Sequence, residues 1–250
     1  MEPLAYRTAG SGEPLILLHG FCESGQIWEP LVRGLSKSFF LVLPDLPGHG
    51  NTPLNREINS INNVAQTVIS LAEKLELEQP VLMGHSMGGY VTLAAVDQRP
   101  DLFRKFGLIH STAFADNDEK KQNRNKSVEF IIRNGPDAFF DIFVPGLYHK
   151  EGPWVKKVDE IVRKTPAETL IRYTEMMRDR PDRSKVLQSF EGPVLLLGGK
   201  MDSFIPWQAL QEQATFATQP HLHIFDHIGH LGMYEDPARV EKVIEEFMWL

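Results

Sequence analysis

The segment 80–90 constrains the fold more than any other part of the chain. Its apolar run at 81–83 has the character of a short buried strand, and apolar side chains at helical spacing follow the segment. Between the two lies Gly84-His-Ser-Met-Gly88, which sets Ser86 at a sharp turn. A serine in a Gly-x-Ser-x-Gly turn that leads from a strand into a helix is the arrangement of a nucleophile elbow.

The two glycines explain how such a turn is built. A Cβ at Gly84 or Gly88 would collide where strand and helix cross at close range. We expect Ser86 to have a strained backbone conformation, which costs about 1–3 kcal/mol and persists only where the surroundings enforce it. The free N–H groups at the start of the helix favour negative charge beside the serine. The alternative interpretation is an ordinary Gly/Ser loop that joins a strand to a helix.

Apolar runs and amphipathic stretches alternate along most of the chain. The predicted strands, besides that at 81–83, are 4–8, 15–18, 39–43, 106–110, 194–197 and 221–225, and the predicted helices are 26–35, 61–75, 207–217 and 238–249. The run at 15–18 shows no polar alternation, as expected for a strand that is buried on both faces. The pattern therefore predicts an α/β fold, with a mostly parallel central sheet and helices on both of its faces.

The alternation stops between residues 112 and 188, where the sequence contains no buried strand. Helices are predicted there instead, at 128–134, 137–144, 154–164 and 167–178, with prolines between them. We expect 112–188 to be a helical lid inserted into a core that consists of 1–111 and 189–250. The polar stretch 116–126 is interpreted as a solvated helix face or hinge and not as a partner site.

Composition limits the class of protein and its partners. The 250 residues carry a formal net charge of −7 with both signs interspersed, which argues against nucleic-acid binding. The longest apolar runs have four or five residues, far below the ~20 that span a bilayer. Cys22 is the single cysteine, and the first residues lack the basic and apolar regions of a signal peptide. We expect a cytoplasmic protein, monomeric or weakly dimeric, that acts on a small molecule, with neither membrane nor nucleic acid as a partner.

Several polar residues directly follow predicted strands, at the edge where ligands bind to a parallel sheet. They are His19, Asp45, Ser86, His110, Ser111, Asp202, Asp226, His227 and His230. A serine hydroxyl is a poor nucleophile unless a base takes its proton and a third group orients that base. The set contains histidines and carboxylates for both roles. No metal-binding spacing such as His-Glu-x-x-His and no phosphate-binding loop is visible, so we expect neither a metal nor a cofactor.

Five motifs occur in the order in which the α/β-hydrolase fold superfamily carries them, and the chain resembles that superfamily. They are His19-Gly20-Phe21, Asp45-Leu-Pro-Gly-His-Gly50, Gly84-His-Ser-Met-Gly88, Gly199-Lys-Met-Asp202 and Gly229-His230. They cover nearly the whole chain apart from 112–188. The branch that looks most similar is that of small bacterial esterases and enol-lactonases with a helical lid. One departure is Asn51-Thr52, where many relatives carry a serine after the Pro-Gly-His-Gly turn.

The resemblance implies a role for each matching residue. Ser86 corresponds to the nucleophile, Asp202 to the acid and His230 to the base, in the chain order that this fold uses. The backbone N–H groups of Phe21 and Met87 correspond to the oxyanion hole, which stabilises the negative charge of a tetrahedral intermediate.

Rival residues remain for the base and the acid. His227 is the closest alternative to His230, but it lacks a flanking glycine, and Asp226 and Asp45 are alternatives to Asp202. Of the other histidines, His19 and His49 are interpreted as structural, His85 as the variable position of the elbow, His221 and His223 as packing or surface residues, and His110 as a candidate substrate contact.

The expected function is that of a serine hydrolase that cleaves a small ester, lactone or thioester through an acyl-Ser86 intermediate. The charge balance and the apolar lid residues favour a small, mostly uncharged acyl compound. The alternatives are carbon–carbon bond hydrolysis or lyase-like chemistry at the same site, and a ligand-binding receptor with little turnover. The candidate pocket residues are Trp28, Cys22, Phe139, Phe143, Leu147, Met176 and Met177.

Overall fold

The computed structural model describes residues 3–250 and contains a central sheet in the order β1-β3-β2-β4-β5-β6-β7. Its strands are β1 (Tyr6–Ala9), β2 (Glu13–Leu18), β3 (Phe39–Pro44), β4 (Val81–His85), β5 (Lys105–Ile109), β6 (Pro193–Gly199) and β7 (Gln219–Phe225). β1 pairs antiparallel with β3, and every other pairing in this sheet is parallel. Met1 and Glu2, part of the segment in which we expect no signal peptide, lie outside the described residues.

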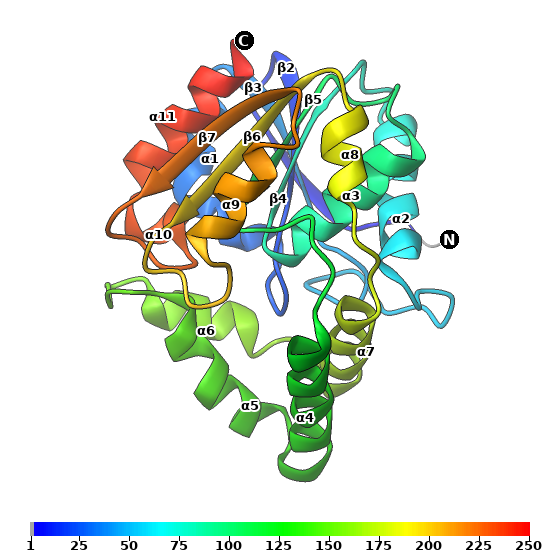
Figure 1. Cartoon of the computed structure of the whole chain (residues 1–250), viewed down its shortest axis with the longest axis vertical. Coiled ribbons are helices and arrows are strands. Elements are labelled where there is room, and N and C mark those ends of the chain that lie inside the picture. Colours follow the sequence, from blue (N-terminus) through cyan, green and yellow to red (C-terminus); the bar gives the residue numbers. More distant parts are fainter. Residues whose placement is uncertain (1–2) are drawn as a thin grey trace.

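Helices cover both faces of the sheet, which confirms the predicted fold class (Figure 1). One group packs around α1 (Glu29–Leu35) and α11 (Pro237–Met248), and the other around α2 (Ile61–Lys74), α3 (Met87–Gln98) and α8 (Ser184–Ser189). The remaining core elements are η1 (Gly25–Trp28), α9 (Trp207–Ala214) and α10 (Gly232–Glu235). Leu15, Ile16, Leu17 and Leu18 are all fully buried, because successive side chains of a strand point to opposite faces and both faces are covered.

The chain between β5 and β6 forms further helices that lie beyond the carboxyl ends of the strands (Figure 1). We call them the inserted helices: α4 (Asp118–Asn134), α5 (Pro136–Phe143), η2 (Val144–Leu147), α6 (Val155–Val162) and α7 (Ala167–Arg178). The predicted helical insertion is therefore present, and α8, which follows it, packs against α3 of the core. The bounds 112 and 188 remain a prediction.

α4 begins ten residues earlier than its predicted start at 128 because a helical cap lies ahead of its polar segment. The side chain of Asn117 accepts a hydrogen bond from Lys120 N at 2.9 Å, and Asp118 and Glu119 occupy the first turn, where negative charge is favourable.

Hydrogen bonds from the inserted helices fix them to loops of the core. Tyr173 Oη donates to the carbonyl of Pro47 at 2.7 Å, and Thr169 Oγ1 donates to Gly48 O at 3.1 Å. Thr165 Oγ1 donates to Cys22 O at 3.0 Å. These donors come from α7 and the turn before it, so this part of the insertion docks on the two loops that follow β2 and β3. Within residues 3–250, no helix has the length and hydropathy to cross a membrane.

Candidate active site

Ser86 occupies a strained turn between β4 and α3. Its φ of 50° lies in the left-handed region, which non-glycine residues rarely adopt. An added Cβ at Gly84 would lie 2.2 Å from the carbonyl carbon of Gly88, and one at Gly88 would lie 2.6 Å from His19 O. The two glycines therefore allow the crossing that the sequence predicted. The turn is further held by Ser86 N, which donates to Ile109 O at 2.9 Å.

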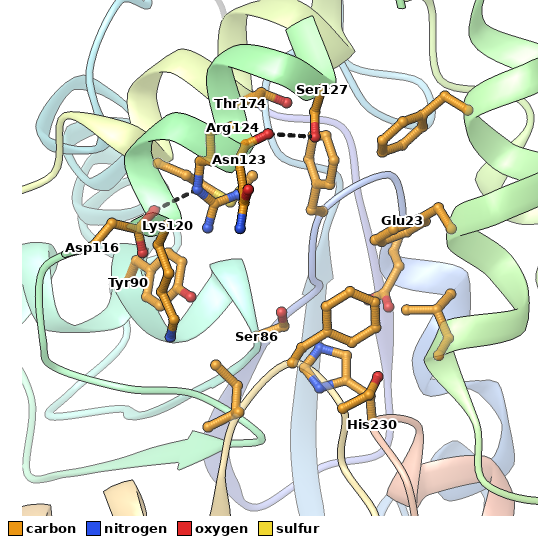
Figure 2. A pocket seen from close by; sticks show the side chains of 18 residues that line it. Glu23, Ser86, Tyr90, Asp116, Lys120, Asn123, Arg124, Ser127, Thr174 and His230 are labelled. Atoms are coloured by element: carbon orange, nitrogen blue, oxygen red, sulfur yellow. Dashed lines mark hydrogen bonds and ion pairs between the residues drawn. The ribbon is translucent and has the colours of Figure 1, made fainter. Parts of the chain in front are cut away.

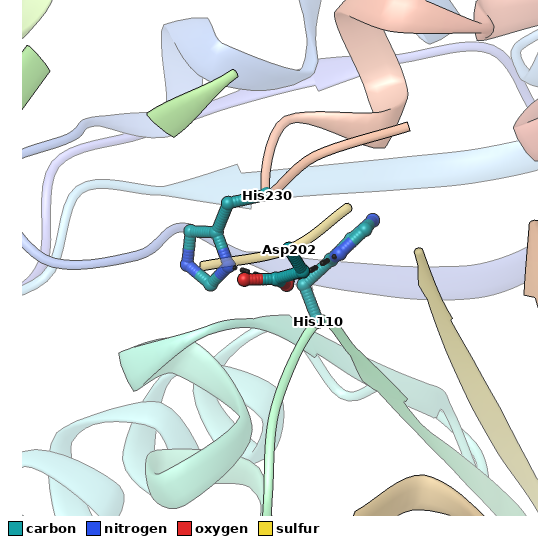
Figure 3. Close-up of side chains that lie close together, drawn as sticks. All are labelled: His110, Asp202 and His230. Carbon is teal, nitrogen blue, oxygen red and sulfur yellow. Dashed lines mark hydrogen bonds and ion pairs between the residues drawn. The ribbon is translucent and has the colours of Figure 1, made fainter. Parts of the chain in front are cut away.

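Asp202 follows β6 and accepts hydrogen bonds at both carboxylate oxygens. Oδ2 accepts from Nδ1 of His230 at 2.8 Å and from Nδ1 of His110 at 2.9 Å (Figure 3). Oδ1 accepts from the backbone N–H groups of Phe204 and Ile205. Burial alone would raise the pKa of Asp202, but the nearby histidines and their hydrogen bonds hold it well below its ordinary value. The carboxylate is therefore ionised and fixed in orientation.

His230 and Ser86 face the same cavity (Figure 2). Within residues 3–250 no direct hydrogen bond joins Ser86 Oγ to the His230 ring, and such contacts are often long in unliganded enzymes. The backbone of His230 is held on both sides, since its N–H donates to Leu147 O at 3.1 Å and its carbonyl accepts from His85 Nε2 at 2.8 Å. The ring of Phe204 lies 5.0 Å from the His230 ring.

The loop that carries His230 is also joined to the insertion by one carboxylate. Glu235 accepts hydrogen bonds from Gly229 N at 2.8 Å, from His149 N at 3.0 Å and from Lys150 N at 3.2 Å. Glu235 therefore braces the His230 loop and links it to the inserted segment.

The rival bases and acids lie elsewhere. His227 and Asp226 are exposed, and Asp226 pairs with Lys200 at 2.7 Å. Asp45 instead braces its own loop, since Oδ1 accepts from Gly25 N at 2.8 Å and Oδ2 accepts from Asn51 N at 2.9 Å. Of the candidate acids, Asp202 is the one that contacts a histidine beside Ser86.

A buried ion pair that the sequence did not indicate lies behind the site. His85 Nδ1 lies 3.0 Å from Oε2 of Glu23, and the same oxygen accepts from Gly20 N at 2.6 Å. Burial opposes both charges, but the attraction between the two groups raises the pKa of His85 and lowers that of Glu23. Since His85 Nε2 also donates to the His230 carbonyl, the ion pair supports the backbone of the candidate base. No sequence motif distinguishes Glu23 from an ordinary loop residue.

The two backbone N–H groups expected at an oxyanion hole belong to the segments that follow β2 and β4. Met87 opens α3, where the first N–H groups have no intrahelical partner, and Phe21 belongs to the turn after β2. Neither N–H donates to another residue within 3–250. Their catalytic role remains a prediction.

The cavity has a volume of about 420 Å³ and lies between the carboxyl edge of the sheet and the inserted helices. Its lining residues are Phe21, Glu23, Ser86, Tyr90, Asp116, Lys120, Asn123, Arg124, Ser127, Phe139, Phe143, Leu147, Thr174, Met177, Ser203, Phe204, Ile205 and His230. The lining contains the predicted Phe139, Phe143, Leu147 and Met177. The polar residues of α4 were not predicted there.

Trp28 and His110 do not line this cavity, which corrects the expectation that they contact substrate. Trp28 is fully buried in η1 and packs edge-on against His85. His110 has a left-handed φ of 51° after β5, and its ring is turned to Asp202. Cys22 and Met176 are likewise buried outside the lining.

His110, Asp202 and His230 offer ligand atoms that lie within 4.8 Å of one another, so they also form a potential metal-binding group. Both Nδ1 atoms, however, are hydrogen-bonded to the same carboxylate oxygen, and these bonds account for their proximity (Figure 3). The expectations of no metal and no cofactor remain predictions.

The site consists of a serine in a turn between a strand and a helix, beside a hydrogen-bonded Asp–His pair. In addition, most of the sequence matches the model of a known protein family. The model of the alpha/beta hydrolase family matches residues 15–243, so the chain belongs to that family. The resemblance that the five motifs indicated is therefore confirmed.

Similar proteins extend the comparison. The structure is similar to that of a thermophilic esterase from Thermogutta terrifontis, with 28% identity and a TM-score of 0.92 over 98% of this chain and 92% of that chain. It is also similar to the enol-lactonase from Burkholderia xenovorans LB400, with 20% identity and a TM-score of 0.91 over 99% and 96%. In sequence it is 25% identical to the uncharacterized hydrolase YugF of Bacillus subtilis, over 94% of this chain and 90% of that protein.

Proposed function

We propose that the chain is a serine hydrolase that cleaves a small ester, lactone or thioester through an acyl-Ser86 intermediate. The observation that carries the proposal is the 2.8 Å hydrogen bond between Asp202 and His230, beside a serine in a left-handed turn. The 28% identity to an esterase of nearly the same length favours ester-type bonds. The inserted helices would act as a lid that excludes water from the reaction.

The positions of the three side chains support the following reaction. His230 Nε2 accepts the Ser86 Oγ proton as Oγ bonds to the carbonyl carbon, while Nδ1–H stays hydrogen-bonded to Asp202. The resulting oxyanion accepts hydrogen bonds from the N–H groups of Phe21 and Met87. The carbon–oxygen or carbon–sulfur bond then breaks, and the leaving group takes the proton from His230. Water, deprotonated by His230, then attacks the acyl-enzyme. The bond to Ser86 Oγ breaks, Oγ takes the proton back from His230, and the carboxylic acid is released.

Labelling with a fluorophosphonate tests the nucleophile, and a panel of 4-nitrophenyl esters and thioesters tests turnover. We expect rapid modification at Ser86, located by mass spectrometry, and its loss in Ser86→Ala. The matched control is Ser203→Ala, which removes another cavity serine whose hydroxyl donates to Gly146 O. A native protein that is labelled at Ser203 or not at all, and that cleaves no ester, would overturn the proposal.

The same experiment separates the alternatives. Labelling at Ser86 without ester turnover would favour carbon–carbon bond cleavage, and ligand-induced stabilisation without product would favour a receptor. A cytoplasmic location, a monomeric or weakly dimeric state, and a small molecule as the partner remain predictions.

A further inference from the structure

The cavity has an apolar part and a polar part. Phe139 and Phe143 stack at 5.3 Å, and Phe21 packs edge-on against both. The other apolar residues of the lining are Leu147, Met177, Phe204 and Ile205. The polar part comes chiefly from α4 and the loop before it.

Four polar side chains of α4 line the cavity at helical spacing: Lys120, Asn123, Arg124 and Ser127. Positions separated by three, four and seven residues lie on one face of a helix. A helix that packs on a core normally turns its apolar face inward, but this segment of α4 turns a polar, basic face toward the cavity. In Figure 2, Lys120 and Arg124 extend from α4 toward the space between Tyr90 and Ser86.

The positive charge at this face is only partly compensated. Arg124 Nε donates to Oδ2 of Asp116 at 2.5 Å, and Arg180 Nη1 lies 2.9 Å from Oδ1 of the same carboxylate. Burial would raise the pKa of Asp116, but the two guanidinium groups outweigh it and hold the pKa below its ordinary value. One ionised carboxylate is therefore paired with two guanidinium groups.

The guanidinium group of Arg180 is held by several contacts, whereas Lys120 and the terminal nitrogens of Arg124 have no such contacts among the described residues. Arg180 donates to Met177 O and Phe114 O and stacks on the Tyr90 ring at 4.0 Å. Within residues 3–250, Lys120 has no ion-pair partner, and the terminal nitrogens of Arg124 donate to no residue.

The other acidic residue of the lining does not neutralise this charge. Glu23 is already paired with His85 on the core side of the cavity. Asn123 adds an amide that makes no hydrogen bond within residues 3–250. The polar part of the cavity thus offers an ammonium group, a free guanidinium edge and an amide.

We propose that the cavity binds a substrate that carries a carboxylate, held by Lys120 and Arg124, with its ester-type bond at Ser86. The inference rests on the proposed hydrolase function and narrows its substrate class to monoesters, lactones or thioesters of acids that retain a free carboxylate. A planar guanidinium and a carboxylate form short, charge-assisted hydrogen bonds, and a nearby ammonium adds a second attraction. The apolar part would receive the carbon chain or the leaving group. This differs from the expectation of a mostly uncharged compound, which rested on the charge balance of the chain and on the apolar lid residues, and not on the face of α4 that meets the cavity.

Two substrates of nearly equal size test the charge preference. They are the 4-nitrophenyl monoester of adipic acid and its methyl-capped, uncharged counterpart, compared through kcat/KM for nitrophenolate release. We expect the wild type to prefer the charged ester about tenfold or more, and Lys120→Met to reduce that ratio about tenfold. Higher salt should also reduce the ratio, because charge attraction is screened. The matched control is Lys126→Met, an exposed lysine of the same helix outside the lining, which should keep the wild-type ratio.

A binding arm separates this inference from the proposed function. In the Ser86→Ala background, calorimetry measures the affinity of the two esters without turnover, and Lys120→Met is added to the same background. Tighter binding of the charged ester that depends on Lys120 supports the inference, even if the wild type hydrolyses neither compound. Equal affinity for the two esters, or a preference that persists in both Lys120→Met and Arg124→Met, overturns it.

Discussion

The core side and the helical side of the cavity hold their charged groups in opposite ways. On the core side, Asp202 accepts four hydrogen bonds and the pair Glu23–His85 is fully buried. On the helical side, Lys120 is exposed, and among residues 3–250 Arg124 forms side-chain hydrogen bonds through Nε alone. For the proposed hydrolase, this difference implies that the fixed groups of the core side perform the reaction. The groups of the helical side that lack partners in the described part of the chain determine which substrate binds. Four substitutions test these two roles, beginning with the largest expected effect.

Asp202→Asn should have the largest effect on turnover. The amide cannot keep His230 in the required tautomer or offset its positive charge, so we expect kcat for 4-nitrophenyl butyrate to fall about 10⁴-fold. Asp226→Asn is the control, because Asp226 is exposed and pairs only with Lys200 at the surface. Equal activity of the two variants would show that Asp202 does not orient the base.

Glu23→Gln should cause the largest loss of stability. Breaking a buried ion pair by removal of one partner costs about 3–5 kcal/mol, whereas Glu29→Gln, which breaks an exposed pair with Arg7, should cost less than about 1 kcal/mol. Urea denaturation measures both. If Glu23→Gln lowers the unfolding free energy no more than Glu29→Gln does, the buried ion pair does not stabilise the core side of the cavity.

The loss of stability in Glu23→Gln should depend on pH. The pKa of His85 is raised above its ordinary 6.5, so its share of the stability is full below about pH 6.5 and is lost as pH rises through the raised value. The pKa of Glu23 is lowered from 4.5, so its share is present above about pH 4.5 and is lost as pH falls through the lowered value. The difference in unfolding free energy between wild type and Glu23→Gln should therefore be largest at about pH 5.5 and smaller at about pH 9.

Tyr173→Phe tests how firmly the helical side is docked. It removes one hydrogen bond to Pro47 O, an acceptor that His49 Nδ1 also approaches at 3.2 Å, so we expect a loss of only about 1 kcal/mol. Tyr6→Phe, at an exposed tyrosine of β1, serves as the control in thermal unfolding. A loss well above this amount would mean that the insertion is as tightly fixed as the core.

His110→Phe should produce the smallest change, a shift in the pH profile. Burial lowers the pKa of His110 to about 4, so at neutral pH its uncharged ring donates Nδ1–H to the oxygen that also binds His230. Removal of this donor leaves more negative charge on Asp202 for His230, which favours the protonated base. The acid limb of kcat/KM should therefore move to higher pH. An unchanged limb with a lowered Tm would assign His110 to packing alone.

The sequence was most informative where burial alone decides the structure. Continuous apolar runs located the parallel strands β2 to β6, because a strand covered on both faces has no polar alternation. β7 is only partly buried, and histidines alternate with apolar residues in it. The strand ends placed Asp202 and His230 among several candidate site residues, and the resemblance to the α/β-hydrolase superfamily singled them out. α4 was partly missed, since its polar residues face a cavity and the segment therefore resembles a solvated surface.

Other features depend on geometry that no local pattern encodes. His110 itself has a left-handed φ after β5, and this conformation turns its ring toward Asp202. The Glu23–His85 pair joins residues that lie 62 positions apart in the sequence. The helical spacing of Lys120, Asn123, Arg124 and Ser127 was present in the sequence, but its meaning required knowledge of which face of α4 meets the cavity.

The bonds around the His230 loop link two events that a hydrolase must keep in order. Leu147 O and the N–H groups of His149 and Lys150 belong to the inserted segment, and they hold the backbone of His230 directly or through Glu235. If this segment swings away to admit a substrate, the loop that carries the base loses the same bonds. With the inserted segment displaced, His230 would no longer be aligned to accept a proton. Ser86 would then become reactive only after the segment has closed over the bound substrate.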